Sequence, residues 1–387
     1  MTSPVLADCI RGGQTRWAGR VLVHFLLPRR PQTQPCRVAR VERAGTHTNM
    51  EFMVQNTTKT TQVAKVREDE GVQLISCCTH PEYGRHILRS LELGPKQAPI
   101  GMVIFVHGTF QHSRSVELDD LQQRVLDLGC MWFGLDAPGH GMSGRLGDPS
   151  SVLAPAMVPD MDAYLEDLLF YIVSVAEERP SLPVILMCHS WGSAIVAMML
   201  PRLEARLGSQ RLRGACFSSC SAIPIGLPDP RTLTFVPELK LRWNAFLTPE
   251  GLGTTGGGRL DIKKTVRDPS LRDRVANDRL RYHQAERPFL SELSWQLGEV
   301  YKRGGQQVPH ITVPLCIHTG SADKAVSPLC GPNLYCHSKT PTSAKQFTLL
   351  PDGAHNLFAD PHRTILMDDW VAFVKRAIQG EFLAAPP

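Results

Sequence analysis

The sequence predicts an α/β fold built on a doubly wound, mostly parallel sheet, and three features of the chain support this class. Short, uniformly apolar runs recur along the chain, and segments with helical periodicity separate them. The runs are too apolar to leave one face in water, which is typical of parallel strands covered by helices on both sides. Residues 221–309 then interrupt the alternation after the sixth strand, and the length of this interruption predicts an inserted helical cap.

The strands are expected first as a hairpin and then as a parallel series. Alternating polar and apolar residues predict strands at 62–66 and 71–76, joined through Asp69-Glu70-Gly71. The parallel strands are expected at residues 102–107, 131–135, 183–188, 214–219, 312–318 and 345–350.

The helices should alternate with these strands and cover both faces of the sheet. They are expected at residues 117–128, 160–178, 193–207 and 361–379. In the second helix, Leu165, Leu168 and Ile172 fall on one stripe, which should face the sheet.

The pattern divides the chain into a core and a cap. The core should comprise residues 60–220 and 310–380, and residues 221–309 should form the cap. The cap sequence is rich in proline and large apolar residues at its start, which suits a lid over a substrate with an acyl tail. Its arginines, including Arg274 and Arg281, are expected on a solvated helix face.

Residues 1–49 form a separate leader with eight arginines, no lysine and two acidic residues. This composition fits an organelle transit peptide, and it equally fits a disordered or misassigned extension upstream of a functional start at Met50. The leader therefore carries a formal charge of +6, whereas the whole chain carries +5, so the remaining chain has a net charge of −1 and is close to neutral. A neutral body gives no electrostatic reason to expect a nucleic-acid partner.

The composition favours a protein of a reducing compartment, and the expected location is the cytoplasm. The 387 residues are 42% hydrophobic, which is enough to bury a large core. No uncharged apolar run reaches the roughly 18 residues that a spanning helix needs. The eleven cysteines show no regular spacing and no Cys-x-x-Cys pair, so the sequence predicts neither a disulfide framework nor a metal site.

Ser190 is the candidate nucleophile. It lies at the centre of Cys188-His189-Ser190-Trp191-Gly192, between the apolar run 184–187 and a helical segment. A sharp turn from a strand into a helix exposes a serine hydroxyl, so that it can attack a carbonyl group. One pentapeptide is weak evidence, and Cys188 replaces its usual first glycine, so the prediction depends on the residues that follow.

The other two candidates follow the last two predicted strands, which gives the order serine, aspartate, histidine. Asp323 comes after the first of these strands and His355 after the second. His355 would take the proton of Ser190, and Asp323 would fix the imidazole tautomer and stabilise its charged form. Asp352 lies closer to His355 in the sequence, but it is interpreted as a turn residue.

Four segments together resemble the α/β-hydrolase superfamily, and within it the branch of monoacylglycerol lipases and lysophospholipases, which is similar to serine aminopeptidase S33. These segments are His107-Gly108-Thr109 with His112-Ser113 behind it, the run 136–143, the turn at Ser190, and the pair Asp323 and His355. With a cap-like segment around 267–283, the resemblance covers roughly residues 65–380. It implies the α/β-hydrolase fold with a helical cap after the sixth strand.

The resemblance also implies an activity, which is the hydrolysis of lipid carboxylic esters through an acyl-enzyme. The expected substrate, and the expected partner, is a small-molecule lipid ester such as a monoacylglycerol or a lysophospholipid. The backbone N–H groups of Thr109 and Trp191 would hold the oxyanion, and no metal or organic cofactor is required. The apolar cap predicts a peripheral contact with membranes, whereas the oligomeric state stays open.

Two alternatives remain. A general carboxylesterase or an aminopeptidase-like α/β hydrolase would use the same triad with a different cap. A non-catalytic scaffold that binds acyl ligands would keep the fold and lose turnover.

This chain departs from the family pattern at Gln111, which replaces an acidic residue, at Ser193, which replaces a glycine, and at Trp191, which replaces a methionine. The indole of Trp191 should reshape the pocket.

Overall fold

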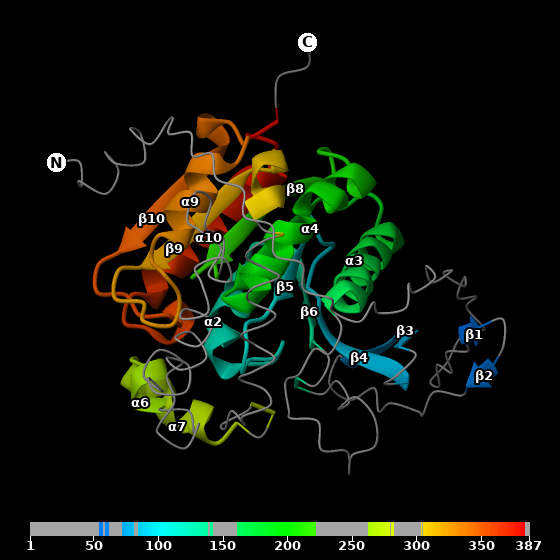
Figure 1. Cartoon of the computed structure of the whole chain (residues 1–387), viewed down its shortest axis with the longest axis horizontal. Coiled ribbons are helices and arrows are strands. Elements are labelled where there is room, and N and C mark those ends of the chain that lie inside the picture. Colours follow the sequence, from blue (N-terminus) through cyan, green and yellow to red (C-terminus); the bar gives the residue numbers. More distant parts are fainter. Residues whose placement is uncertain are drawn as a thin grey trace, which may run out of the picture.

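The described part of the chain forms one eight-stranded sheet with helices on both faces (Figure 1). The strand order is β10-β9-β8-β7-β5-β6-β4-β3, and neighbouring strands from β10 to β6 are parallel. Strand β4 runs antiparallel to both of its neighbours. The predicted doubly wound, mostly parallel sheet is therefore confirmed. The computed structural model describes residues 54–56, 59–61, 72–80, 84–137, 140–141, 161–221, 262–278, 280–281, 303 and 305–383.

The six predicted parallel strands are confirmed to within three residues at each end. The sheet consists of β3 Val72–His80, β4 Gly84–Leu93, β5 Gly101–Val106, β6 Cys130–Leu135, β7 Val184–His189, β8 Leu212–Ser218, β9 Leu315–Gly320 and β10 Lys345–Leu350. A separate two-stranded sheet pairs β1, Val54–Asn56, with β2, Lys59–Thr61.

The structure differs from the predicted hairpin at the start of the sheet. The expected strand at 71–76 overlaps β3, but β3 pairs with β4, which the sequence pattern did not predict. In β4, charged residues such as Arg89 and Glu92 interrupt the apolar residues without strict alternation, so the strand pattern is weak. The other expected strand, 62–66, lies outside the described residues.

The four predicted helices are also present. They are α2 Asp119–Asp127 preceded by the 3₁₀ turn η1 Val116–Leu118, α3 Met161–Glu178, α4 Trp191–Leu207 and α10 Arg363–Ile378. The structure adds α9, Cys330–His337, whose eight residues include a glycine and a proline and therefore carry a weak helical signal. Short 3₁₀ turns lie at η2 Val308–His310, η3 Thr342–Ala344 and η4 Leu357–Ala359.

Two apolar layers, one on each face of the sheet, make up the core. Alternate residues of β5 point to opposite layers, with Ile104 in the layer of α3 and α4 and Phe105 in the layer of α2 and α10. Both side chains are fully buried. Since each large apolar side chain contributes roughly 1.5–3 kcal/mol when it is buried, a strand covered on both faces must be apolar throughout.

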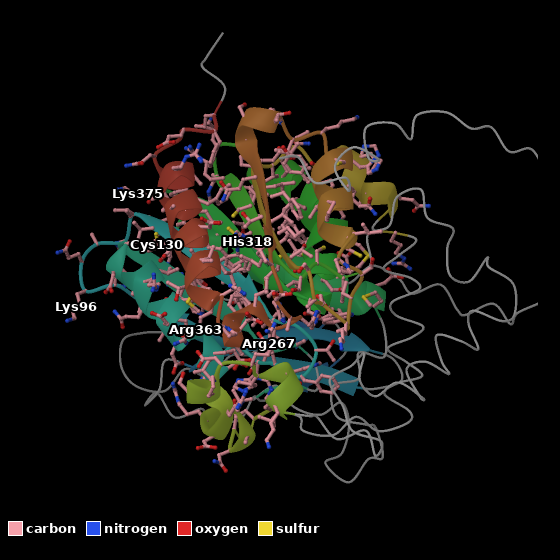
Figure 2. All side chains as sticks on the ribbon, turned by 90° about the vertical axis from the view of Figure 1, so that its left-hand side faces the viewer. Lys96, Cys130, Arg267, His318, Arg363 and Lys375 are labelled. Carbon is pink, nitrogen blue, oxygen red and sulfur yellow. The ribbon has the colours of Figure 1, made fainter. Side chains whose placement is uncertain are left out.

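Within the predicted cap, the structure describes two short helices, α6 Ile262–Thr265 and α7 Pro269–Ala276, which lie at the bottom of Figure 1. Helix α7 begins after Asp268, whose carboxylate accepts a hydrogen bond from the backbone N–H of Ser270 at 2.9 Å. Val266, Leu271 and Val275 pack against Ala359 of η4. Figure 2 shows Arg267 and Arg363 at this junction, where they pair with Asp360 and Asp268.

These contacts attach the α6–α7 segment to the core next to the loop that carries His355. Most of the cap and the whole leader 1–49 lie outside the described residues, so the boundaries of core, cap and leader stay predictions. In the described part of the chain, no helix is both long and apolar enough to span a membrane.

Candidate active site

Ser190 occupies a sharp turn between β7 and α4. Its backbone adopts φ 52° and ψ −123°, an uncommon conformation for a residue other than glycine, and it immediately precedes the first residue of the helix. Gly192 makes the turn possible, because a Cβ atom at this position would lie 2.4 Å from the carbonyl oxygen of Val106. The end of β5 and the start of α4 are therefore in direct backbone contact, which is the strand-turn-helix arrangement expected for an exposed nucleophile.

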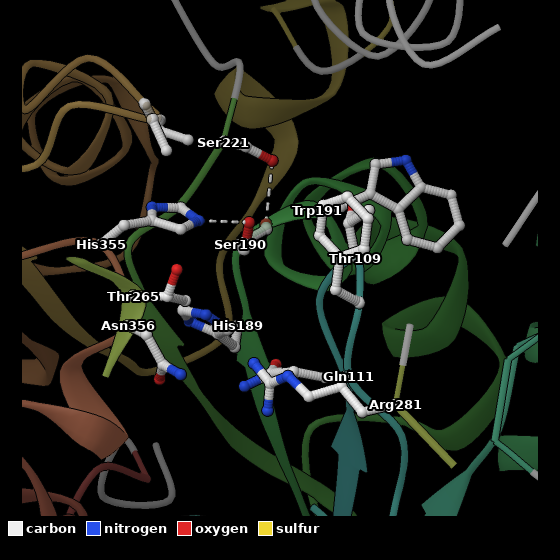
Figure 3. A pocket seen from close by; sticks show the side chains of 13 residues that line it. Thr109, Gln111, His189, Ser190, Trp191, Ser221, Thr265, Arg281, His355 and Asn356 are labelled. Carbon is white, nitrogen blue, oxygen red and sulfur yellow. Dashed lines mark hydrogen bonds between the residues drawn. The ribbon is translucent and has the colours of Figure 1, made fainter. Parts of the chain in front are cut away.

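The carbonyl group of Ser190 is held from two sides. It accepts a hydrogen bond from the backbone N–H of Ser193, at 3.0 Å, in the first turn of α4. The hydroxyl of Ser221, at the end of β8, donates to the same oxygen at 2.9 Å (Figure 3). Ser221 was not identified from the sequence, because no pattern relates the end of one strand to the turn after another.

The structure brings Ser190, His355 and Asp323 into one chain of hydrogen bonds. The Oγ atom of Ser190 lies 2.7 Å from Nε2 of His355, as Figure 3 shows. The Nδ1 atom of the same imidazole lies 2.8 Å from Oδ2 of Asp323. The loops after β9 and β10 are linked by backbone bonds, including Ala322 N–H to Gly353 C=O at 2.9 Å, and these bonds hold the carboxylate beside the imidazole.

The carboxylate of Asp323 fixes the state of the histidine. Its other oxygen accepts hydrogen bonds from the backbone N–H groups of Ala325 and Val326, both at 2.9 Å. A carboxylate stabilised in this way acts only as an acceptor, so Nδ1 of His355 must carry a proton and donate it. The Nε2 atom is then free to accept the hydroxyl proton of Ser190.

His189 packs beside this chain as a neutral ring. Its imidazole lies 5.2 Å from that of His355 and edge-on to Phe358 at 5.4 Å. Burial is the main cause that holds the pKa of His189 well below its ordinary value, and the neighbouring His355 adds to the effect. His189 therefore adds no positive charge next to His355.

Thr109 and Trp191 line the same pocket as Ser190. Trp191 is the first residue of α4, and its backbone N–H belongs to the unpaired, partly positive N-terminus of the helix. In the described part of the chain, neither this N–H nor that of Thr109 donates to a protein acceptor. Both groups predicted to bind an oxyanion are thus available at the pocket wall.

A buried ion pair closes one side of the pocket. Nη1 of Arg281 lies 2.5 Å from Oε1 of Glu117, and the two side chains are 2% and 0% exposed. The same oxygen accepts hydrogen bonds from Gln111 at 3.1 Å and from Asn356 at 3.3 Å. Burial alone would raise the pKa of Glu117, but the charge and hydrogen bond of Arg281 outweigh it and lower the pKa to about 2.

The expectation that the cap arginines lie on a solvated face is therefore wrong for Arg281 and correct for Arg274. The side chain of Arg274 is 53% exposed and pairs with Asp119 at the surface. Arg281 enters the core because Glu117 is already buried there and needs a counter-charge. Glu117 itself was missed by the sequence analysis, and no local signal marks it.

The departures from the family pattern have local explanations. The thiol of Cys188 donates to the carbonyl of Cys216 at 3.1 Å, and the hydroxyl of Ser193 donates to the carbonyl of Ser218 at 3.2 Å. The amide of Gln111 accepts from the N–H of Gly108 at 3.1 Å and donates to Glu117. A carboxylate at position 111 would meet a second carboxylate, so an amide suits this position better than the acidic residue usual in the family.

Both polar and apolar side chains line the pocket. The indole of Trp191 stacks on Tyr164, with ring centroids 5.2 Å apart, and forms part of the wall. The described residues that line the pocket are Thr109, Phe110, Gln111, His189, Ser190, Trp191, Ser221, Thr265, Arg281, Ala325, Val326, His355 and Asn356. Among the residues that the structure describes, no group of three or more histidine, cysteine or acidic side chains is arranged to hold a metal ion.

A family model described as serine aminopeptidase, S33, matches residues 97–362, which is more than half of the chain. The chain belongs to this family. The monoglyceride lipase of Rattus norvegicus is similar to it, with 26% identity over 231 residues that cover 59% of this S33 chain and 67% of that protein. The monoacylglycerol lipase of Mycolicibacterium smegmatis is 21% identical over 282 residues, which cover 72% and 90% of the two chains.

Solved structures show the same fold. The carboxyl esterase of Bacillus coagulans superposes with a TM-score of 0.58 and 18% identity, covering 80% of this S33 chain and 99% of that one. The monoacylglycerol lipase of Paleococcus ferrophilus gives a TM-score of 0.50 and 22% identity, covering 74% and 99%. The resemblance to the monoacylglycerol lipase branch of the α/β-hydrolases is therefore confirmed, and the S33 chain is a hydrolase of the lipase and esterase type.

Proposed function

We propose that this S33 hydrolase cleaves carboxylic esters of lipids, with Ser190 as the nucleophile, His355 as the base and Asp323 as the acid that orients it. The observation that carries the proposal is the unbroken hydrogen-bond chain from Asp323 through His355 to Ser190, with Ser190 Oγ and His355 Nε2 2.7 Å apart. All three side chains are held by short contacts within the fold, so little reorganisation is needed before the reaction.

The proposed reaction has two halves. In the first, Ser190 Oγ forms a bond to the ester carbonyl carbon while its proton moves to Nε2 of His355. The C–O bond to the alcohol then breaks, and His355 returns the proton to the leaving alcohol. In the second half, a water molecule gives a proton to His355 while its oxygen forms a bond to the acyl carbon. The bond between this carbon and Ser190 Oγ then breaks, His355 returns the proton to Ser190, and the carboxylic acid leaves. Asp323 stabilises the imidazolium form and stays ionised.

The developing negative charge on the carbonyl oxygen would be held by the backbone N–H groups of Thr109 and Trp191. Removing one such donor typically lowers turnover by ~10² to 10³. Because both donors are main-chain groups, the replacement of the family's methionine by Trp191 leaves this function intact.

The pocket composition supports an ester substrate over a peptide with a free N-terminal amine. An aminopeptidase needs an acidic group that binds the substrate ammonium, and none of the described pocket residues is acidic. Glu117, the nearest candidate, is fully buried and already paired with Arg281. A cation at this wall would repel a second cation.

The pocket wall includes the apolar side chains of Phe110, Trp191 and Val326, which supports a substrate with an acyl tail. The relatives named monoglyceride lipase and monoacylglycerol lipase favour a monoacylglycerol substrate, and a lysophospholipid remains the second candidate within the same class. A cytoplasmic location and a peripheral contact of the cap with membranes stay predictions, as does targeting by the leader.

Purified full-length protein tests the proposal with a panel of monoacylglycerols, lysophospholipids, short p-nitrophenyl esters and aminoacyl amides. We expect ester cleavage and no amide cleavage, and Ser190→Ala should lower ester turnover by ~10⁴ or more without changing the thermal melting temperature. A fluorophosphonate probe should label the wild-type protein at Ser190. If the wild-type protein is neither labelled nor active, the protein is a non-catalytic scaffold. If Ser190→Ala retains most of the turnover, another nucleophile is responsible.

A further inference from the structure

Thr109 carries a side-chain hydroxyl at the position that also offers a backbone N–H to the oxyanion. Its side chain lines the pocket together with Ser190 and Trp191. No described residue accepts or donates a hydrogen bond to this hydroxyl, and it is not among the buried polar atoms that lack a partner. The hydroxyl is therefore accessible to solvent and has no partner among the described residues, and it belongs to a residue of the pocket wall.

The loop that carries Thr109 is held rigidly. The backbone N–H of Gln111 donates to the carbonyl of Gly108 at 3.2 Å, and the side chain of Gln111 accepts from the N–H of Gly108 at 3.1 Å. His107 donates from Nδ1 to the Gly108 carbonyl at 2.8 Å and accepts the N–H of Ala137 at 2.9 Å. Thr109 therefore sits in a turn whose flanking residues are fixed on both sides.

The same loop is pressed against the nucleophile. A Cβ atom added to Gly108 would lie 2.9 Å from Cβ of Ser190, so the backbone before Thr109 directly contacts the serine turn. Figure 3 shows Thr109 and Trp191 on the side of Ser190 opposite to His355. A carbonyl carbon bonded to Ser190 Oγ would direct its oxygen to this side, because His355 occupies the other.

We propose that the hydroxyl of Thr109 is a third donor to the oxyanion, in addition to the N–H groups of Thr109 and Trp191. The amide nitrogen and the hydroxyl oxygen of one threonine are separated by only two carbon atoms, so both can point at the same acceptor. The hydroxyl has no competing protein partner in the described part of the chain, and it can rotate toward the oxygen as negative charge develops there. This inference rests on the proposed function and identifies a further catalytic residue for it.

The Thr109 hydroxyl should act as a hydrogen-bond donor mainly in the transition state. The carbonyl oxygen of the bound ester carries a partial charge, whereas the tetrahedral intermediate carries a full one, and hydrogen bonds to charged groups are stronger. A hydroxyl that meets this oxygen therefore raises kcat more than it lowers KM. A threonine that only fills space would have no such effect.

Replacing Thr109 by valine tests the inference, because valine keeps the branched shape and the backbone N–H and removes only the hydroxyl. Thr109→Val should lower kcat for a p-nitrophenyl ester by ~10 to 100-fold, less than the loss of a sole oxyanion donor, and leave KM within about threefold. Thr109→Ser restores the hydroxyl without the methyl group, so it should recover most of the lost turnover. Thermal melting of both variants confirms that they fold.

A second measurement separates catalysis from packing. A boronic acid inhibitor, which forms a tetrahedral anion on the serine, should bind Thr109→Val more weakly by about the same factor as kcat falls, and a fatty-acid product should bind equally well to both proteins. Wild-type kcat in Thr109→Val overturns the inference, and so does a Thr109→Ser variant that is as impaired as Thr109→Val. A wild-type protein without ester hydrolysis overturns the proposed function and this inference together, and the two failures are thereby distinguished.

Discussion

The buried pair of Glu117 and Arg281 gives a prediction whose size follows from the structure. Arg281→Met removes the guanidinium and keeps much of the apolar volume, which leaves the carboxylate of Glu117 in the core without a counter-charge. In the wild-type protein the pKa of Glu117 is lowered from 4.5 to about 2 despite its burial. Each pKa unit corresponds to about 1.4 kcal/mol, so the surroundings of Glu117, among which Arg281 is the largest favourable contribution, stabilise the ionised carboxylate by a net free energy of roughly 3 kcal/mol.

The expected loss in the free energy of unfolding at pH 7 is therefore about 3–5 kcal/mol, which is typical of removing one partner of a buried ion pair. Urea denaturation of the full-length protein, followed by circular dichroism, measures it. Arg274→Met is the matched control, since it breaks a pair with Asp119 in which both side chains are half exposed. It should cost at most about 1 kcal/mol.

The pH dependence has a defined sign. In the wild-type protein the folded-state pKa of Glu117 is lowered, so its contribution is present above about pH 4.5 and is lost as the pH falls toward 2. In Arg281→Met, burial is the largest remaining influence on Glu117 and raises its pKa, although the hydrogen bond from Gln111 still opposes it. The penalty is therefore greatest at pH 7 and declines as the carboxyl group is protonated. The difference between the two proteins should thus be larger at pH 7 than at pH 4.

The double variant Glu117→Gln/Arg281→Met removes both charges and should recover most of the stability that Arg281→Met loses at pH 7. The reasoning would be refuted if the free energy of unfolding of Arg281→Met at pH 7 were within about 1 kcal/mol of the wild-type value, because an uncompensated buried carboxylate costs more than this. The same conclusion would follow if the double variant were as unstable as the single one.

Two further predictions concern the pocket wall and the thiols. Gln111→Glu places a second carboxylate against Glu117, so it should lower the free energy of unfolding at pH 7 by about 1–3 kcal/mol in urea denaturation, and an unchanged value would contradict the contact. Iodoacetamide should alkylate Cys336, which is exposed, before Cys130, Cys188, Cys216, Cys220, Cys316 and Cys330, which are buried; burial also raises the pKa of Cys188. Peptide mapping by mass spectrometry checks this order, and early modification of Cys188 in the folded protein would contradict it.

The parallel part of the fold could be predicted because two-sided burial leaves a simple signal. Each strand from β5 to β9 contacts apolar layers on both faces, so its sequence is predominantly apolar. Strand β4 at the antiparallel end has no such signal, and α9 is too short for a clear helical period. These two elements depend on tertiary contacts with the sheet, which a local sequence pattern does not reveal.

The hydrogen-bonded chain at Ser190 could be anticipated because each of its members follows a recognisable strand. Parallel strands end at one edge of the sheet, so side chains just beyond three of these ends can meet there. The partnership of Glu117 with Arg281 was not predictable in this way. The two residues are 164 positions apart, and Arg281 lies among other arginines whose pattern indicated a solvated face. Only the burial of Glu117, which is a tertiary property, distinguishes Arg281 from its neighbours.

The four departures from the family pattern then fall into two groups with different consequences. Cys188, Ser193 and Gln111 each find hydrogen-bond partners within the fold, so they leave the chain of Asp323, His355 and Ser190 undisturbed. Trp191 differs, because its indole N–H is buried without a partner in the described part of the chain and its ring lines the pocket. A buried indole N–H without a partner costs stability, so hydrogen bonding within the described residues does not account for Trp191. Because its side chain belongs to the pocket wall, we expect Trp191 to be the departure that alters substrate choice, and its backbone N–H keeps its proposed role toward the oxyanion.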